Sequence, residues 1–224
     1  MDLGFRAEDA VLAETVVFVE GESDRRAVEG VVGWLSEEDT VRGGTLVASL
    51  GGCGVVWGTR RDTLRRQIDM FQQVAPYTSA VVLLDSDGRP SEELDECRRA
   101  FQPLGVPVTF LERRELEDYW LEAPAVHAVI EQAALDAAEG GSPFPAPNLD
   151  EVATALGALR QEKQGKKGSD LLAELFFRLS RCTYPKIRGA QTAIAKLREL
   201  SPASAEQLKE EVSRALGAAR RRGA

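Results

Sequence analysis

The feature that most restricts the fold of this chain is the continuous apolar run Ala80–Leu84, which reads AVVLL and is followed directly by Asp85. A run of strand length without polar alternation is typical of a strand that is buried on both faces. Such strands occur in parallel sheets whose two faces are covered by helices. The run therefore predicts an α/β fold.

The first half of the chain alternates strand-like and helix-like segments, as a parallel sheet requires. The other predicted strands are Thr15–Val19, Thr45–Leu50 and Val106–Leu111. The predicted helices are Ser23–Leu35, capped by Ser23 or Asp24, then Thr59–Val74, and a helix from Pro90 to about Gln102. We expect a mainly parallel four-stranded sheet flanked by helices, with its ligand site at the carboxyl ends of the strands.

The second half is expected to be helical. No convincing strand follows Tyr119, and Gly140–Asn148 (GGSPFPAPN) is a predicted loop. The amphipathic segments there are Asp150–Arg160, Ser169–Arg181, Ala190–Leu200 and Ala203–Ala219. The sequence therefore predicts an α/β core over residues 1–122 and an additional C-terminal helical subdomain over residues 123–224.

Composition excludes several classes of protein. No apolar run approaches the roughly 20 residues of a membrane span, and no signal peptide is evident, so the expectation is a cytoplasmic protein without membrane association. The three cysteines are far apart and suggest neither a disulfide framework nor a zinc site. The net charge of −8 argues against a protein that coats nucleic acid electrostatically, unless some carboxylates bind cations.

Acidic residues follow three of the predicted strands. They are Glu20 and Asp24, then Asp85 and Asp87, then Glu115, Glu117 and Asp118. Carboxylate oxygens are ligands for hard cations such as Mg²⁺ or Mn²⁺. Two such ions can activate a water on one side of a phosphate and stabilise the leaving oxygen on the other. The pattern predicts a two-metal site, although Asp24 could be a simple helix cap and Glu112–Asp118 a solvated charge run.

Three segments resemble known motifs. VVFVEGESDRRAV is similar to the first motif of Toprim domains, and LLDSDGRP to their second, the DxD pair. The continuation ESD, and the later stretch LERRELEDYW, resemble more specifically the overcoming-lysogenization-defect (OLD) family of ATP-dependent nucleases. The resemblance covers roughly residues 1–122, is weak beyond them, and implies a Toprim fold.

The resemblance also implies site residues. Glu20, Asp24, Asp85, Asp87 and a downstream glutamate would hold the metal ions. Glu115 and Glu117 match that last position, and Glu117 is preferred. The family uses a catalytic lysine in its late helical part, for which Lys186 in YPKIRGAQTAIAKL is the best candidate and Lys167 and Lys196 are alternatives. Lys186 precedes a predicted helix and lies near Arg188, a position that suits stabilisation of phosphate charge.

The implied activity is DNA endonuclease cleavage by a two-metal mechanism, with Glu20, Asp85 and Lys186 as the catalytic residues. DNA would bind the basic residues Arg60, Arg61, Arg65, Arg66 and Arg188, although each basic cluster could also be a solvated face. Because OLD proteins carry an ATPase, the resemblance implies an ABC-type ATPase domain as a partner, in the same full-length chain. This sequence departs from the family in lacking a Walker A motif, since no GKS or GKT follows Gly51–Gly54, so the chain is expected to be either a stand-alone Toprim protein or a fragment of a longer chain. A homodimer, and a role in phage defence or DNA repair, are expectations by analogy.

Alternative functions remain open at this point. A Toprim module could serve a topoisomerase or a primase, or could bind DNA in a non-catalytic, regulatory role. A strand followed by DxDG also opens the haloacid-dehalogenase phosphatases, in which Asp85 would be a nucleophile. Against that reading, Arg89 follows the glycine, and an earlier strand carries Glu20.

Overall fold

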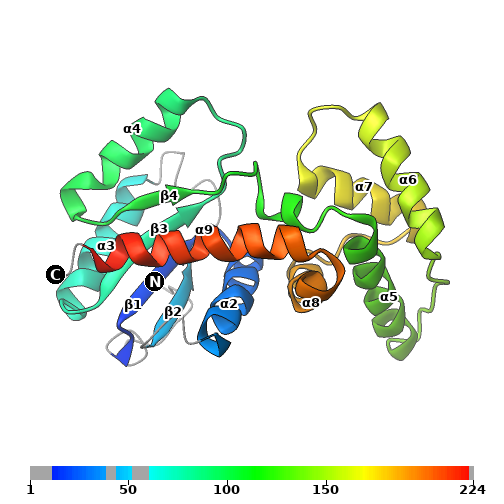
Figure 1. Ribbon diagram of the computed structural model, residues 1–224, viewed down its shortest axis with the longest axis horizontal. Helices are drawn as coiled ribbons and strands as arrows, with labels where there is room; N and C mark the ends of the chain where they lie inside the picture. The colour runs from blue at the N-terminus through cyan, green and yellow to red at the C-terminus, as the bar shows by residue number, and fades with distance from the viewer. Residues whose placement is uncertain (1–11, 39–43, 52–60, 222–224) are drawn as a thin grey trace. The chain divides into compact units, whose positions relative to one another are not determined.

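The computed structural model describes residues 12–38, 44–51 and 61–221 of the chain, and the side chains of residues 61, 63 and 64 lie outside this description. Figure 1 shows the described elements in chain order. They are β1 (Thr15–Val19), α2 (Glu22–Glu37), β2 (Thr45–Ser49), α3 (Arg61–Val74), β3 (Ser79–Leu84), α4 (Ser91–Phe101), the 3₁₀ turn η2 (Gln102–Leu104), β4 (Val108–Phe110), the 3₁₀ turn η3 (Leu116–Tyr119), α5 (Ala123–Glu139), α6 (Leu149–Glu162), α7 (Gly168–Ser180), α8 (Lys186–Leu200) and α9 (Pro202–Arg220).

The sheet has the strand order β2-β1-β3-β4, and every pairing in it is parallel. Strands β1 and β3 are neighbours at its centre, with Thr15 opposite Ser79 and Phe18 opposite Val82. The predicted mainly parallel four-stranded sheet flanked by helices, with additional C-terminal helices, is thereby confirmed.

The central strands are buried on both faces, as the unbroken apolar run of β3 predicts. On one face Val16 and Phe18 of β1, with Val82 of β3, join a cluster that also includes Phe71 of α3 and Phe101 of α4. Phe18 meets Phe71 edge to face, with ring centroids 5.4 Å apart. The alternate residues Val17, Val19, Val81 and Leu83 are buried on the opposite face. Burial of both faces explains why these strands carry no polar alternation.

The helix after β1 begins three residues earlier than an Asp24 cap implies. Its N-cap is Gly21, and Asp24 occupies the third helical position. From there the Asp24 Oδ2 atom accepts a hydrogen bond from the Gly21 N–H at 2.9 Å, which is half of a capping box. The prediction that Ser23 or Asp24 is the N-cap is therefore wrong. Asp24 instead accepts a hydrogen bond from the N-cap backbone N–H from its place inside the first turn.

The chain divides into two compact units. The first contains residues 1–112 and 209–224, and the second contains residues 113–208. In the first unit, the later part of α9 binds the end of β4, because Glu211 Oε2 accepts a hydrogen bond from the Glu112 N–H at 2.9 Å. Lys209 forms an ion pair with Glu38 at the end of α2, at 3.0 Å. The predicted boundary at residue 122 stays a prediction.

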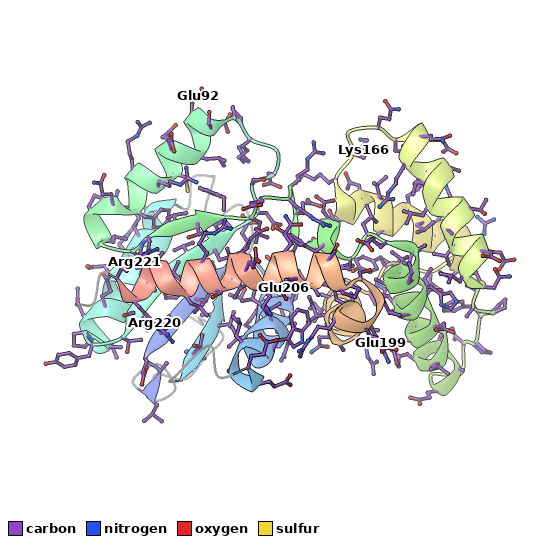
Figure 2. The ribbon with its side chains drawn as sticks, viewed as in Figure 1. Glu92, Lys166, Glu199, Glu206, Arg220 and Arg221 are labelled. Carbon is purple, nitrogen blue, oxygen red and sulfur yellow. The ribbon has the colours of Figure 1, made fainter. Side chains whose placement is uncertain are left out.

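The second unit is helical. Helix α5 packs against α6 and α8 through the buried residues Ala125, Val126, Val129 and Ile130. The 140–148 segment between α5 and α6 is a loop, as its Gly and Pro content predicts, and His127 Nε2 lies 3.1 Å from the Pro147 carbonyl oxygen within it. Charged residues such as Glu92 of α4 in the first unit and Glu199 of α8 in the second lie on exposed faces (Figure 2). No helix in residues 12–38 and 61–221 is both long and apolar enough to span a membrane.

Candidate active site

The carboxyl ends of β1 and β3 carry the first two acidic groups. Glu20 follows β1 directly and Asp85 follows β3 directly. The parallel register pairs Phe18 with Val82, so these two ends lie side by side at one edge of the sheet. Glu20 and Asp24 are both buried, each with 8% of its residue surface exposed. Parallel sheets bind ligands at this edge, which makes it the candidate site.

The second group is carried by a tight turn. Asp87 and Gly88 have φ angles of 55° and 66°, and the Arg89 N–H donates to the Ser86 carbonyl oxygen at 2.9 Å. Two successive positive φ angles are the mark of a type I′ turn, for which Asp-Gly is a preferred pair. The turn reverses the chain immediately after β3 and fixes the Asp87 backbone in the left-handed conformation. Arg89 Nε lies 3.9 Å from Asp87 Oδ2.

The donor atoms of this edge suit a hard cation, because Glu20, Asp24, Asp85 and Asp87 all offer carboxylate oxygens. One Asp24 oxygen accepts a hydrogen bond from Gly21, and the other accepts one from Ser23 Oγ at 3.0 Å, which orients this carboxylate. In the described part of the chain, no three side chains of His, Cys, Asp or Glu converge closely enough to hold one metal ion. The metal roles of these residues therefore stay predictions.

The third acidic group lies on η3 in the second unit and is not a solvated charge run. Glu117 has 2% of its surface exposed and Glu115 has 5%. Lys186 is the first residue of α8, and its Nζ lies 3.4 Å from Glu117 Oε1. The structure thus brings together the preferred downstream glutamate and the preferred lysine. Burial of a carboxylate at this depth is costly without a cationic or hydrogen-bonding partner, and Lys186 supplies one.

Glu115 is engaged differently from Glu117. Its Oε2 accepts hydrogen bonds from the backbone N–H and the hydroxyl of Ser169, at 3.0 and 2.8 Å. Its Oε1 lies 3.1 Å from Lys167 Nζ. Ser169 is in the first turn of α7, so Glu115 supplies the carboxylate that the positive end of this helix favours. Both oxygens of Glu115 have protein partners, and its contacts favour a structural role.

Asp118 completes the base of this turn. Its Oδ2 accepts a hydrogen bond from the Glu115 N–H at 3.1 Å, which closes η3 as a capping box. Burial raises the pKa of the Asp118 carboxyl above its usual value, and the hydrogen bond from Glu115 acts in the opposite direction. Gly168 packs against the carboxyl so closely that an added Cβ would lie 2.4 Å from Oδ1. The 3₁₀ turn η3 therefore packs closely against the start of α7, where only glycine at position 168 leaves enough room.

Arg113 is a residue of this unit that the sequence patterns did not single out. Its guanidinium donates to the Asp118 carbonyl oxygen at 2.6 Å and to Ser204 Oγ at 3.0 Å. The same group lies over the Tyr119 ring, 4.7 Å from its centroid. Arg113 thereby holds both ends of the segment that carries Glu117. Its membership in the LERRELEDYW stretch was the available signal, but charge alternation there predicts a solvated run equally well.

Tyr184 is the second residue that the patterns missed. It is 7% exposed, and burial raises the pKa of its phenol, an effect that the nearby Glu117 carboxylate reinforces and the Trp120 indole N–H opposes. A buried phenol with a raised pKa is poorly suited to nucleophilic attack. Trp120 itself is 1% exposed and packs in the interior of the second unit.

The predicted DNA-binding arginines are only partly described. Arg60 and the side chain of Arg61 lie outside the described residues. Arg66 is exposed on α3, where its Nε donates to the Asp62 carbonyl oxygen at 3.3 Å, and Arg65 lies 4.0 Å from the Asp62 carboxylate. In the second unit, Arg188 is exposed and its Nε lies 3.1 Å from Asp136 Oδ2. DNA binding by these residues stays a prediction.

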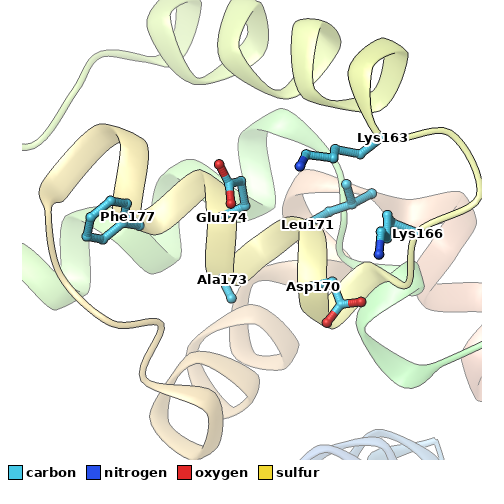
Figure 3. A pocket seen from close by; sticks show the side chains of 7 residues that line it. All are labelled: Lys163, Lys166, Asp170, Leu171, Ala173, Glu174 and Phe177. Atoms are coloured by element: carbon cyan, nitrogen blue, oxygen red, sulfur yellow. The ribbon is translucent and has the colours of Figure 1, made fainter.

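A pocket of about 420 Å³ lies in the second unit along α7 and the end of α6 (Figure 3). Lys163 and Lys166 flank it on one side, and Asp170, Glu174 and Phe177 come from α7. Its lining mixes both signs of charge and includes none of the predicted catalytic carboxylates. The pocket therefore does not mark the candidate site.

A search of solved structures gives a match over nearly the whole chain. The matched structure is described as the C-terminal region of the Burkholderia pseudomallei OLD protein, with a TM-score of 0.55 and 17% sequence identity over 95% of this chain and 99% of that one. The chain has the fold of an OLD C-terminal region. The predicted OLD resemblance is thereby confirmed for the fold, including the helical half, where the sequence motifs are weak. No protein-family model and no curated protein matches the chain.

Proposed function

We propose that this chain is the nuclease part of an OLD-type protein and hydrolyses DNA phosphodiester bonds with the help of divalent cations. The observation that carries the proposal is the pair of acidic groups at the adjoining carboxyl ends of β1 and β3. A fold likeness alone does not define an activity, because one fold hosts many functions. Acidic groups at the ligand-binding edge of a parallel sheet of this fold supply the specific chemistry.

Glu20, Asp24, Asp85 and Asp87 of the first unit would hold Mg²⁺ or Mn²⁺. A bound divalent cation supplies Lewis-acid stabilisation of the negative charge that grows on the phosphate during cleavage. The chain's own contribution is placement. Asp24 is oriented by two hydrogen bonds from its own helix start, and the turn after β3 sets the Asp87 backbone.

The second unit contributes Glu117 and Lys186. Lys186 carries a positive charge at the N-terminus of α8, where backbone N–H groups also favour an anion. An ammonium group in that position can stabilise charge on a phosphate or a leaving oxygen. Glu117 would serve as a further cation ligand, in preference to Glu115, whose two oxygens bind α7 and Lys167.

The proposal extends to partners by analogy with OLD proteins. An ATPase region in the full-length chain, a homodimer, and DNA contacts through Arg65, Arg66 and Arg188 are parts of it.

The test is cleavage of supercoiled plasmid by the purified chain in Mg²⁺, in Mn²⁺ and in EDTA. We expect nicking or linearisation that requires the cation and disappears in Asp85→Ala. Asp95→Asn is the matched control, because Asp95 is an exposed acid of the same unit that pairs with Arg98 at 2.7 Å on α4. Cleavage by Asp85→Ala at the wild-type rate, with both variants folded, would refute the site.

A further inference from the structure

Tyr184 carries a buried hydroxyl group that lacks a hydrogen-bond partner among the described residues. Native folds rarely leave a buried hydroxyl in that state, because the group has lost its hydrogen bonds to water. The exception asks for an explanation in terms of what the hydroxyl faces.

The position of the phenol is set by tight packing. Its ring lies against Phe176, with the ring centroids 5.1 Å apart. On the other side is Gly189 of α8, where an added Cβ would lie 2.6 Å from Cε2 of the tyrosine. The ring is thus held between α7 and the first turn of α8, and the hydroxyl is directed by the fold rather than by a bond of its own.

The segments that carry Glu117 and Trp120 lie next to the segment that carries this phenol. Lys186, two residues after Tyr184, has its Nζ 3.4 Å from Glu117 Oε1, and the Trp120 backbone N–H donates to the Glu117 carbonyl oxygen at 3.2 Å. The charge of Glu117 raises the pKa of the phenol, and the Trp120 indole N–H opposes that effect. The Trp120 indole nitrogen is also buried without a hydrogen bond to a described residue. An indole N–H can only donate, an ionised carboxylate can only accept, and a phenol does both. A chain of hydrogen bonds from Trp120 to Tyr184 to Glu117 would give the indole N–H and the phenol O–H a partner each.

We propose that Tyr184 is a positioning residue for Glu117, whose carboxylate its phenol O–H orients when the site is at work. The inference rests on the proposed function, in which Glu117 is a cation ligand. Glu117 Oε1 faces Lys186 at 3.4 Å. A donor to the carboxylate then fixes the direction in which it presents an oxygen to a cation. Groups that orient a metal-binding side chain in this way typically change metal affinity or activity 10- to 100-fold.

The experiment compares Mn²⁺ binding, measured by electron paramagnetic resonance of the free ion, in the wild type, Tyr184→Phe and Glu117→Gln. Tyr77→Phe is the control, because Tyr77 is 98% exposed and its hydroxyl faces solvent. We expect Tyr184→Phe to weaken Mn²⁺ binding about tenfold and Tyr77→Phe to leave it unchanged. The double variant Tyr184→Phe/Glu117→Gln should bind no more weakly than Glu117→Gln alone, because the phenol acts through the carboxylate.

Urea unfolding in EDTA separates positioning from a structural role. Phenylalanine keeps the ring and removes a buried hydroxyl that has no partner, so the midpoint for Tyr184→Phe should stay unchanged or rise. A lowered midpoint would overturn the inference and make the hydroxyl a structural group. So would wild-type Mn²⁺ affinity in Tyr184→Phe while Glu117→Gln binds weakly. If Glu117→Gln itself binds like the wild type, the role of Glu117 in the proposed function fails, and this inference fails with it.

Discussion

Gly168 is the position at which one added methyl group should have the largest structural effect on the candidate site. It is the first residue of α7 and is buried against Asp118. In Gly168→Ala the new Cβ would lie 2.4 Å from Asp118 Oδ1 and 3.2 Å from the Asp118 backbone nitrogen. Aspartate has a short side chain, and Asp118 cannot swing aside without losing the hydrogen bond that its Oδ2 accepts from Glu115.

The magnitude follows from these two effects. Overpacking of a filled interior costs about 1–3 kcal/mol. Loss of one hydrogen bond adds about 0.5–1.5 kcal/mol. The helix propensity of alanine over glycine returns up to about 1 kcal/mol, and less in the first turn than in a helix interior. The free energy of unfolding should therefore fall by about 2 kcal/mol, which lowers the unfolding temperature of a chain of this size by roughly 4–8 °C.

Thermal unfolding followed by circular dichroism measures this effect, and Gly157→Ala is the matched control. Gly157 is exposed within α6 of the same unit, and a Cβ there would meet nothing within 4 Å. Its replacement should raise the free energy of unfolding by roughly 0.5–1 kcal/mol, so the two variants are predicted to shift stability in opposite directions. If Gly168→Ala is as stable as Gly157→Ala, the close fit of α7 against η3 is refuted.

Three further predictions concern the same turn and the cation site. Burial raises the pKa of Asp118, so the folded chain keeps the proton of this carboxyl to higher pH than the unfolded chain does. The free energy of unfolding of the wild type, relative to that of Asp118→Asn, should therefore fall as pH rises from about 4 through the raised pKa. Urea unfolding at a series of pH values measures this, and an equal dependence on pH in both proteins would contradict it. Arg113→Lys should lower the free energy of unfolding by roughly 1–3 kcal/mol, because an ammonium group cannot reproduce the contacts of the planar guanidinium with Asp118, Ser204 and the Tyr119 ring. An unchanged midpoint in urea unfolding would show that these contacts do not stabilise the fold. Mn²⁺ at 100 times its dissociation constant should raise the free energy of unfolding of the wild type by about 2.7 kcal/mol and leave that of Asp85→Ala unchanged. A thermal shift assay measures this, and an equal rise in unfolding temperature in both proteins would show that Asp85 is not a ligand.

Much of the first unit was predictable because its patterns are local. Strand β1 was predicted with the bounds that it has, and β3 to within one residue, since each is a short apolar run that ends at an acid. The strand ends then located Glu20 and Asp85, because parallel strands present their carboxyl ends at one edge. The N-cap of α2 was missed. Gly21 followed three residues later by Asp24 is a possible helix start, and so is Ser23 or Asp24 as the N-cap, and the local pattern alone did not choose between these alternatives.

The second unit was predictable as helices but not as a site. Sequence order alone left Glu115 and Glu117 as equivalent matches. Their difference lies in contacts with residues far along the chain, Ser169 and Lys167 for Glu115 and Lys186 for Glu117. Such contacts depend on how the helices pack, and no periodicity within a segment encodes them.

The sequence by itself determined the kind of sheet, the order of its elements and the acids at its strand ends, because each follows from the apolar or polar character of neighbouring residues. The tertiary structure alone decided which acids are buried, that Glu115 binds the start of α7, and that the Tyr184 hydroxyl is buried near Glu117. The physical reason is that burial and hydrogen bonding between distant segments are properties of the packed chain, whereas strand and helix formation depend largely on local pattern.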